Sequence, residues 1–508
     1  MSRSGARSPR IGPATRRLVP SAAAIATVLA VVSLGLMTHP AGADEISCDD
    51  MRWTAVWAGP PSDASRTEDV SSIVDPSANR LGGVRNSTVR AIATPSTGGS
   101  ETRVHLSNRF GTAPVTFDRV TIGVQTTGPA VAAGSLEEVR FDGEKAVTVA
   151  AGDDAVSDSV AFSFESGQPI AVSVFVAGDA AMPTIHYTAR QASYLTPPNG
   201  GDQTTDVEGS KLSEKTTSRP FLTGIDVRTT GDFGTVVALG DSITDGFQGQ
   251  APDGRPETVE GIDQNVRYPD FLAERLRSAG KPLGVINAGI SGNRLLRDGA
   301  DGGNIATNGP STASRVEQDV LGRAGVTTVI LLVGINDLGK TPNATADELI
   351  SGYVEMIQSL HQAGLNVVHG TLTPVGGSTS YGTPEIEAER QKVNAWIRSN
   401  SPADAIVDFD AALRDPVDAT RLDPRFDGGD HLHMSPAGNR AMAEAVDPGD
   451  LRPAACAATG ATGRTGAEEG TGTGKAPWIA ALVAVLLIAV LGAAFIVHRH
   501  VARERTGP

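Results

Sequence analysis

The chain has 508 residues, a formal net charge of −15 and only two cysteines. This length allows about three domains, and the balance of 40% hydrophobic and 20% charged residues indicates a folded protein rather than a disordered one. The negative charge disfavours a nucleic-acid partner. Two cysteines exclude a disulfide-rich scaffold and a four-cysteine zinc site.

Residues 1–43 are predicted to be a secretory signal peptide. They contain five arginines and no acidic residue, and an apolar run over 18–37 follows the arginines. The small residues at 41–43 then match the pattern of a cleavage site. Because the apolar run is long for a signal, an uncleaved N-terminal membrane anchor is the alternative.

Residues 44–228 are predicted to form an all-β sandwich. Short runs of alternating apolar and polar residues are separated by Gly, Pro, Asp and Ser, which is typical of such domains. The clearest runs are 103–106, 115–117, 120–124 and 171–176. The sequence leaves open whether this region binds a ligand, shapes a catalytic cleft or only spaces the next domain from the membrane.

From about residue 231 apolar strand candidates alternate with helical stretches, which predicts a doubly wound parallel sheet covered on both faces. The expected strands are 235–239, 283–287, 327–333, 365–370 and 405–409. The expected helices are 269–278, 314–323, 345–362, 385–398 and 436–446. In such a sheet, reactive residues follow the carboxyl ends of the strands.

The C-terminal residues are predicted to anchor the chain in a membrane. A Gly-, Thr- and Ala-rich linker over 457–475 leads into 478–497, which carries no charge and is long enough to span a bilayer as a helix. The basic tail 498–508 is then expected in the cytoplasm, with the body of the chain outside the cell. A buried core helix is the alternative for the apolar segment.

The two cysteines, Cys48 and Cys456, flank the predicted folded body. Outside the cell a disulfide between them would clasp its two ends together. Two free thiols are the alternative, because the sequence does not supply the geometry of a bridge.

Four short motifs carry residue types that can do chemistry. The first three follow the first three strand candidates, and the fourth lies near the end of the domain. They read Gly-Asp-Ser-Ile-Thr at 240–244, Asn-Ala-Gly at 287–289, Gly-Ile-Asn-Asp at 334–337 and Asp-His-Leu-His at 430–433. Each is weak alone, but the set in this order is specific.

Through these motifs residues 232–448 resemble the SGNH, or GDSL-type, hydrolase family. The first motif has Ile243 where the name-giving motif of the family has leucine. The resemblance implies a serine esterase on a flavodoxin-like sheet. The residues that give the family its name map onto Ser242, Gly289, Asn336 and His433.

The residue types fit acyl transfer. Ser242 becomes a nucleophile when a neighbouring base takes its proton, and an imidazole such as that of His433 is such a base near neutral pH. Asp430, three residues earlier, is placed to orient that imidazole. Alternatively, Ser242 only caps the following helix. His431 competes as the base, but the family spacing from Asp430 selects His433.

An oxyanion hole is expected from the backbone N–H groups of Ser242 and Gly289 and the side-chain amide of Asn336. Plain turn roles are the alternatives for Gly289 and Asn336. Two acidic residues beside the motifs, Asp241 and Asp337, are expected to shape loops. For Arg294 the sequence leaves two roles open, a contact with the substrate and a place on the surface.

No metal-ligand motif, P-loop or dinucleotide motif is present, so the chemistry requires no cofactor or metal. The sequence thus predicts a membrane-anchored extracellular serine ester hydrolase. By analogy of layout with some carbohydrate deacetylases, the expected substrates are short acyl esters, such as acetyl groups, of carbohydrates or small alcohols. A lipase or lysophospholipase is the alternative, and a non-catalytic glycan-binding surface protein is the alternative from another class.

Overall fold

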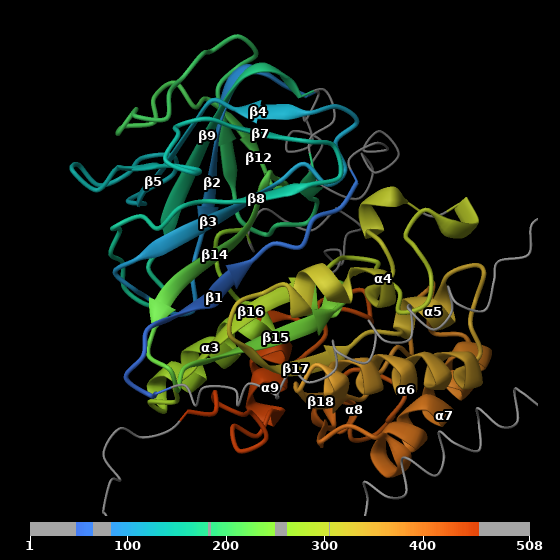
Figure 1. Cartoon of the computed structure of the whole chain (residues 1–508). Helices are drawn as coiled ribbons and strands as arrows, with labels where there is room; N and C mark the ends of the chain where they lie inside the picture. The colour runs from blue at the N-terminus through green and yellow to red at the C-terminus, as the bar shows by residue number, and fades with distance from the viewer. Residues whose placement is uncertain (1–46, 64–82, 181–183, 249–261, 304, 457–508) are drawn as a thin grey trace, which may run out of the picture. The chain divides into compact units, whose positions relative to one another are not determined.

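The computed structural model describes an antiparallel β region followed by an α/β region (Figure 1). The described residues are 47–63, 83–180, 184–248, 262–303 and 305–456. Four predicted segments lie outside them: the signal peptide (1–43), the linker (457–475), the membrane helix (478–497) and the basic tail (498–508). None of the helices in the described ranges combines the length and apolar character needed to cross a membrane.

The β region is built from two antiparallel sheets. The larger has the order β12 (Glu214–Thr216), β11 (Ser193–Leu195), β2 (Val84–Ala93), β9 (Ile170–Ala180), β5 (Arg119–Val124) and β6 (Glu137–Val139). The smaller has the order β1 (Arg52–Ala58), β14 (Leu222–Thr229), β3 (Thr102–Ser107) and β8 (Asp154–Val156). Two further antiparallel pairs are β4 (Val115–Phe117) with β7 (Val147–Val149), and β10 (Ile185–His186) with β13 (Arg219–Pro220).

Alternating side chains of the two sheets share one core, as in a sandwich. Val104 and Leu106 of β3 lie in the same buried cluster as Val89 and Ala91 of β2. Each of these strands sends every second residue inward, which is the period-2 pattern read from the sequence. All four runs predicted from that pattern are strands.

The α/β region contains the predicted parallel sheet. Its strand order is β16 (Leu283–Gly289), β15 (Gly234–Gly240), β17 (Val326–Leu332), β18 (Asn366–Gly370) and β19 (Ala405–Val407), all parallel. This is the order of flavodoxin-like sheets. One expected strand, 405–409, is shorter than predicted. The Asp408 side chain accepts a hydrogen bond from the N–H of Ala411 and caps a short helix, so the strand ends at Val407.

Helices cover both faces of this sheet. They are α2 (Ser242–Asp245), α3 (Tyr268–Ser278), α4 (Thr312–Val316), α5 (Ile335–Gly339), α6 (Ala346–Gln362), α7 (Pro384–Asn400), α8 (Phe409–Leu413) and α9 (Pro436–Ala445). The helix predicted over 314–323 begins as α4 and continues as a π-helical turn, Glu317–Leu321. Short 3-10 turns lie at Asp301–Gly303 and Ala306–Asn308.

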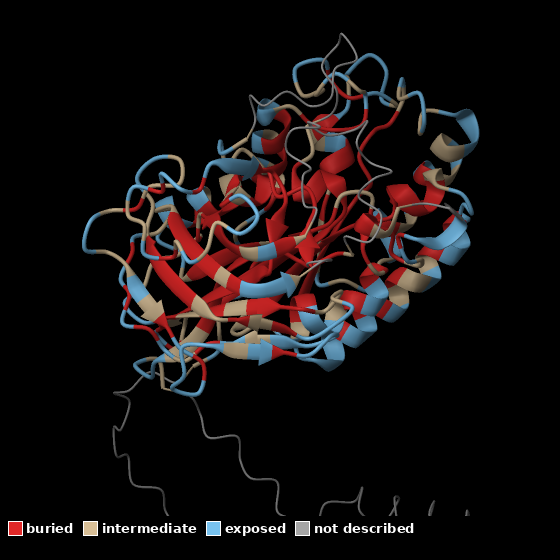
Figure 2. Cartoon of the chain, turned by 90° about the horizontal axis from the view of Figure 1, so that it is seen from above, coloured by how far each residue is buried: buried red, intermediate tan, exposed pale blue. Residues whose placement is uncertain are grey.

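The two faces of β15 bury different helices. Val236 and Ala238 pack in a cluster with residues of α3, α8 and α9, whereas Val237 and Leu239 pack with residues of α6 and α7. Figure 2 shows the strands largely in the buried colour and the outer sides of several helices in the exposed colour. Burial of both faces explains why the strands read as continuous apolar runs.

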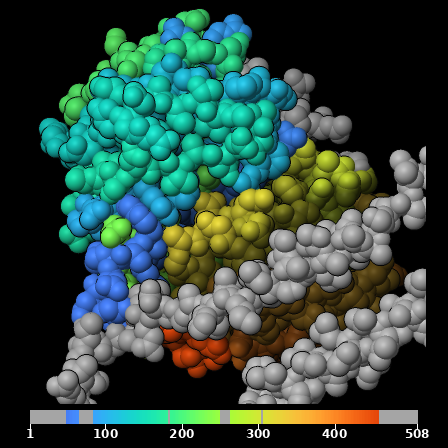
Figure 3. Space-filling view, viewed as in Figure 1, coloured from blue at the N-terminus to red at the C-terminus, as the bar shows by residue number. Residues whose placement is uncertain are grey.

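The β and α/β regions lie within one compact unit. Ala55 and Ala58 of β1 belong to the same buried cluster as Val237, and the N–H of Ala55 donates to the carbonyl of Ala324 at 2.8 Å. In the space-filling view, atoms of the β region border the yellow atoms of the α/β region directly (Figure 3). A Cys48–Cys456 disulfide, with a Cα–Cα distance of 5.0 Å, joins the ends of the described body.

Candidate active site

Ser242 stands at the carboxyl end of the central strand β15. The strand ends at Gly240, Asp241 caps α2 by accepting a hydrogen bond from the N–H of Ile243 at 3.0 Å, and Ser242 is the first residue of that helix. A Cβ at Gly240 would lie 2.1 Å from the Thr244 hydroxyl and 2.4 Å from the Leu332 carbonyl, so only glycine fits this tight turn. The turn therefore presents the serine at the edge of the sheet.

Three predicted side chains form a continuous hydrogen-bonded chain. Ser242 Oγ lies 2.8 Å from His433 Nε2, and His433 Nδ1 lies 2.6 Å from Asp430 Oδ2. Asp430 Oδ1 also accepts from the N–H groups of Leu432 and His433. This arrangement fixes the imidazole with Nδ1 toward the carboxylate and Nε2 toward the serine, which is the orientation a general base requires.

The carboxyl of Asp430 is held in its charged form. Burial by itself raises the pKa of Asp430, but the hydrogen bond and charge of His433 and the two backbone N–H groups outweigh it and lower the pKa below its ordinary value. A charged Asp430 stabilises the imidazolium that forms when His433 accepts a proton.

The amide of Asn336 is fixed at both ends. Its Nδ2 donates to the Asn293 carbonyl at 3.0 Å, and its Oδ1 accepts from the Tyr381 hydroxyl at 2.7 Å. An amide nitrogen carries two hydrogens, so one N–H remains beyond the bond to Asn293. Asn336 lines the cavity beside Ser242, where that second N–H can meet a substrate oxygen.

The prediction that the Gly289 N–H belongs to the oxyanion hole is wrong. The Gly289 N–H already donates to Asn287 Oδ1 at 2.8 Å, and Gly289 does not line the cavity. Its Cβ position would lie 2.3 Å from the backbone nitrogen of Asp245, so the absent side chain allows β16 to pack against α2 instead. Gly292, three residues later, lines the cavity with a φ of 77°, and its N–H has no hydrogen-bond partner within the described ranges.

Ser242 and His433 open onto a cavity of about 220 Å³. It has apolar walls from Phe247, Ile305 and Leu432 and a polar side that includes Ser291, Thr307, Asn308 and Lys340. The ring of Phe247 packs edge-on against His433, with centroids 4.6 Å apart. The β region contributes Tyr187 and Thr188 to the same wall.

Lys340 brings a cationic side chain to the wall of this cavity. Its Nζ donates to the Gly292 carbonyl at 3.1 Å, and the Asn308 amide oxygen accepts from it at 2.9 Å in the orientation that satisfies both ends of that amide. Burial lowers the pKa of Lys340 to about 8, although Asp241 and Asp337 oppose the shift. The ammonium has three hydrogens, so a third remains for a polar group of a substrate.

The two acidic residues beside the motifs shape the backbone, as expected. Asp337 accepts from the N–H groups of Leu295 and Leu296 at 2.7 and 2.9 Å and so holds the loop after β16. Burial raises the pKa of Asp337 to about 6 and that of Asp241 to about 7. Arg294 has neither proposed role, because it is buried at 1% exposure and does not line the cavity.

His431 lies outside the hydrogen-bonded chain. Its Nδ1 pairs with Asp427 Oδ2 at 2.5 Å, its side chain is about half exposed, and its φ of 59° places it in a turn. The structure therefore brings His433, not His431, to Ser242.

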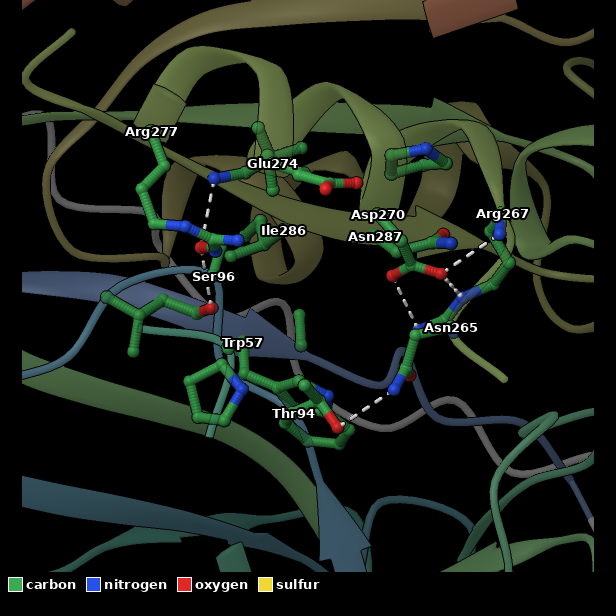
Figure 4. Close-up of a pocket in the computed structure, with 17 residues that line it drawn as sticks. Trp57, Thr94, Ser96, Asn265, Arg267, Asp270, Glu274, Arg277, Ile286 and Asn287 are labelled. Carbon is green, nitrogen blue, oxygen red and sulfur yellow. Dashed lines mark hydrogen bonds and ion pairs between the residues drawn. The ribbon is translucent and has the colours of Figure 1, made fainter. Parts of the chain in front are cut away.

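A second cavity, of about 180 Å³, lies between β1, α3 and β16 (Figure 4). Arg267 and Asp270 face each other across one end, where two hydrogen bonds of 2.7 and 3.0 Å join their side chains. Asn265 reaches Thr94 at 3.3 Å. The residues that line this cavity include no serine–histidine pair, so it lacks the machinery found at Ser242.

At the carboxyl edge of the parallel sheet, a carboxylate orients an imidazole, and the imidazole makes a serine hydroxyl nucleophilic. This arrangement is the catalytic triad of a serine hydrolase. The α/β region therefore has the fold and the site of that class. Residues 238–441 match the GDSL-like lipase/acylhydrolase family. This α/β region belongs to that family, and the chain is a carboxylic ester hydrolase of the GDSL type.

Several solved structures are similar to the chain. An aryl esterase of M. smegmatis shares 18% identity over 42% of this chain and 95% of its own, with a TM-score of 0.34. A carbohydrate acetylesterase of Sinorhizobium meliloti shares 15% over 42% and 95%, with a TM-score of 0.32. A family two carbohydrate esterase of Clostridium thermocellum, solved with cellohexaose, shares 16% over 70% and 89%, with a TM-score of 0.31. No curated protein matches the chain.

Proposed function

We propose that the chain hydrolyses esters of short acyl groups, such as acetate, on carbohydrates or other small polar alcohols. The observation that carries the proposal is the Ser242–His433–Asp430 chain opening onto a small, mainly apolar cavity that has Lys340 on one side. Its volume of about 220 Å³ is below the roughly 300–1,000 Å³ of pockets that hold drug-sized ligands, which favours a short acyl group. The third N–H of Lys340 favours an alcohol with further polar groups.

In this mechanism Ser242 Oγ attacks the ester carbonyl carbon while His433 Nε2 takes the hydroxyl proton. The bond to the alcohol then breaks, and the alcohol leaves with that proton. An acyl group remains on Ser242. Water, deprotonated by His433, attacks this acyl-enzyme and releases the acid, and Asp430 orients the imidazole in both steps.

The carbonyl oxygen becomes negatively charged in both tetrahedral intermediates and needs donors already in place. We assign this role to the backbone N–H groups of Ser242 and Gly292 and to Asn336 Nδ2. Ser242 begins a helix, so its N–H precedes the first intrahelical bond. Gly292 replaces the expected Gly289 because the N–H of Gly289 is occupied.

We further propose that this activity faces the cell exterior from a membrane-anchored chain. The signal-like residues 1–43 and the uncharged segment 478–497, followed by a basic tail, support this placement. The test of this placement is to label intact cells with a reagent that does not cross the membrane. The catalytic region should be labelled, and the C-terminal tail, which serves as the control, should be protected.

The test of the activity uses the purified full-length protein and its Ser242→Ala variant on p-nitrophenyl esters from acetate to palmitate. We expect serine-dependent rates that are highest for the acetate ester. In a second assay, we expect the wild type to release acetate from acetylated oligosaccharides. Rates that are highest for long acyl chains would indicate that the substrate is a lipid ester and not a carbohydrate ester. Equal, negligible rates for the two folded proteins would overturn the assignment to an esterase and favour a glycan-binding role.

A further inference from the structure

His186 of β10 is a buried histidine that reaches from the β region to the helix carrying the nucleophile. It is 5% exposed. Its Nδ1 lies 2.8 Å from the carbonyl oxygen of Pro60, and its Nε2 lies 2.9 Å from Asp245 Oδ1. Both ring nitrogens of His186 are thus within hydrogen-bond distance of an oxygen atom. His186 is therefore a buried histidine that joins the Pro60 carbonyl to the Asp245 carboxyl.

Asp245 also accepts hydrogen bonds from the α/β region. Its second oxygen, Oδ2, accepts from the backbone N–H of Ser291 at 2.9 Å and from the Ser291 hydroxyl at 2.6 Å. The guanidinium groups of Arg219 and Arg267 are also close enough to interact with its charge. The carboxyl of Asp245 is thus hydrogen-bonded to His186 of the β region and to the N–H and hydroxyl of Ser291 in the α/β region.

This carboxylate joins the two backbone segments that form the reacting centre. Asp245 is the last residue of α2, whose first residue is Ser242. Ser291 immediately precedes Gly292, which lines the cavity. Through Asp245, the turn that carries Gly292 is held against the helix that carries the nucleophile. A shift of either segment changes the distance between the serine oxygen and an oxyanion donor.

Besides His186, the β region contributes two neighbouring residues to the active-site cavity. The next two residues, Tyr187 and Thr188, line the active-site cavity. The segment is held at its base because Ile185 pairs with Pro220 in β13, and its carbonyl accepts from the N–H of Ser62 at 2.6 Å. The three consecutive residues 186–188 therefore lie on a supported strand end rather than on an isolated loop.

We propose that the β region is a working part of the active site, with His186 as the positioning residue through which it acts. His186 fixes Asp245, and Asp245 fixes the spacing between Ser242 and Gly292. The inference rests on the proposed esterase function, since it assigns the β region a task in that reaction. It predicts that loss of the His186 contact slows the chemical step and leaves the affinity for a small substrate nearly unchanged.

The experiment compares full-length His186→Gln, Asp245→Asn and the double variant with the wild type. The readouts are kcat and KM on p-nitrophenyl acetate and the rate at which a fluorophosphonate labels Ser242. We expect kcat and the labelling rate to fall roughly 10- to 100-fold, the range for one charge-assisted hydrogen bond, with KM within about threefold. The double variant should be no slower than Asp245→Asn, because the two residues act through one contact.

His105→Gln is the matched control. His105 Nε2 also pairs with a buried carboxylate, that of Asp226, at 2.8 Å, but within the smaller sheet of the β region. It should lower the Tm to a similar extent and leave kcat unchanged. Ser291→Ala, which removes one hydroxyl without changing the charge, is the milder second variant. It should slow labelling about three- to tenfold.

A His186→Gln protein with the wild-type kcat and labelling rate would overturn the proposal, as would an equal loss of kcat in His105→Gln. Should His186→Gln not fold, an unchanged labelling rate in folded Ser291→Ala would overturn it as well. Failure of the esterase proposal gives a different result. In that case the wild type hydrolyses none of the esters, while the labelling rates still report on the geometry around Ser242.

Discussion

Replacement of Asn336 by alanine isolates the contribution of one oxyanion donor. Asn336 Nδ2 has one hydrogen bonded to the Asn293 carbonyl and one left for the substrate, and its orientation is held by Tyr381. Loss of one such donor costs about 2.7–4 kcal/mol of transition-state stabilisation. At about 1.4 kcal/mol per tenfold, kcat should fall roughly 100- to 1,000-fold.

The assay is steady-state hydrolysis of p-nitrophenyl acetate, with KM expected within a fewfold of the wild type. The donor acts on the charge that develops in the transition state, so binding of the neutral ester should change little. Asn394→Ala is the matched control. The Asn394 amide is also buried, but among the described residues its hydrogen bonds go to the backbone of Leu372, so its loss should lower stability and spare kcat. A kcat of Asn336→Ala within threefold of the wild type would refute the oxyanion role.

Two further predictions concern stability. Burial raises the pKa of Asp241 to about 7, so the folded protein loses stability as this carboxyl ionises between its unfolded pKa of about 4 and pH 7. Asp241→Asn keeps a helix-capping oxygen but cannot ionise. Its Tm advantage over the wild type should therefore be larger at pH 8 than at pH 5, and a pH-independent difference would contradict the burial argument. Removal of the Cys48–Cys456 disulfide, which closes a separation of 408 residues, should cost about 2–4 kcal/mol and lower the Tm by several degrees. An unchanged Tm in a Cys48→Ser, Cys456→Ser variant would contradict it.

Much of the fold could be predicted from the sequence because its elements have strong local periods. The five buried strands of the parallel sheet read as apolar runs, and the α6 helix was visible from residues that share one face, such as Leu349, Tyr353 and Ile357. The errors fall at ends. The strand at 405–409 was predicted too long because Phe409, an apolar residue, begins a helix that Asp408 caps.

The candidate site was predictable to the extent that its residues follow strands. Ser242 and Asn336 each follow a strand of the sheet, and the structure brings Ser242, His433 and Asp430 into one hydrogen-bonded chain. The choice of Gly289 failed because two glycines lie near the end of β16. The motif gave no means of telling which N–H was free. Tyr381 was missed because its contact with Asn336 spans 45 residues without a sequence signal.

The sequence by itself determined the order of the elements and the residue types that carry the chemistry, since hydrophobic period and short motifs are local properties of the chain. Only the tertiary structure decided that Gly292 faces the cavity, that Tyr381 holds Asn336, and that His186 of the β region pairs with Asp245. Each of these depends on packing between segments distant in sequence. A hydrogen bond across such a distance has no period and no fixed spacing, so it arises only once the sheets and helices have packed.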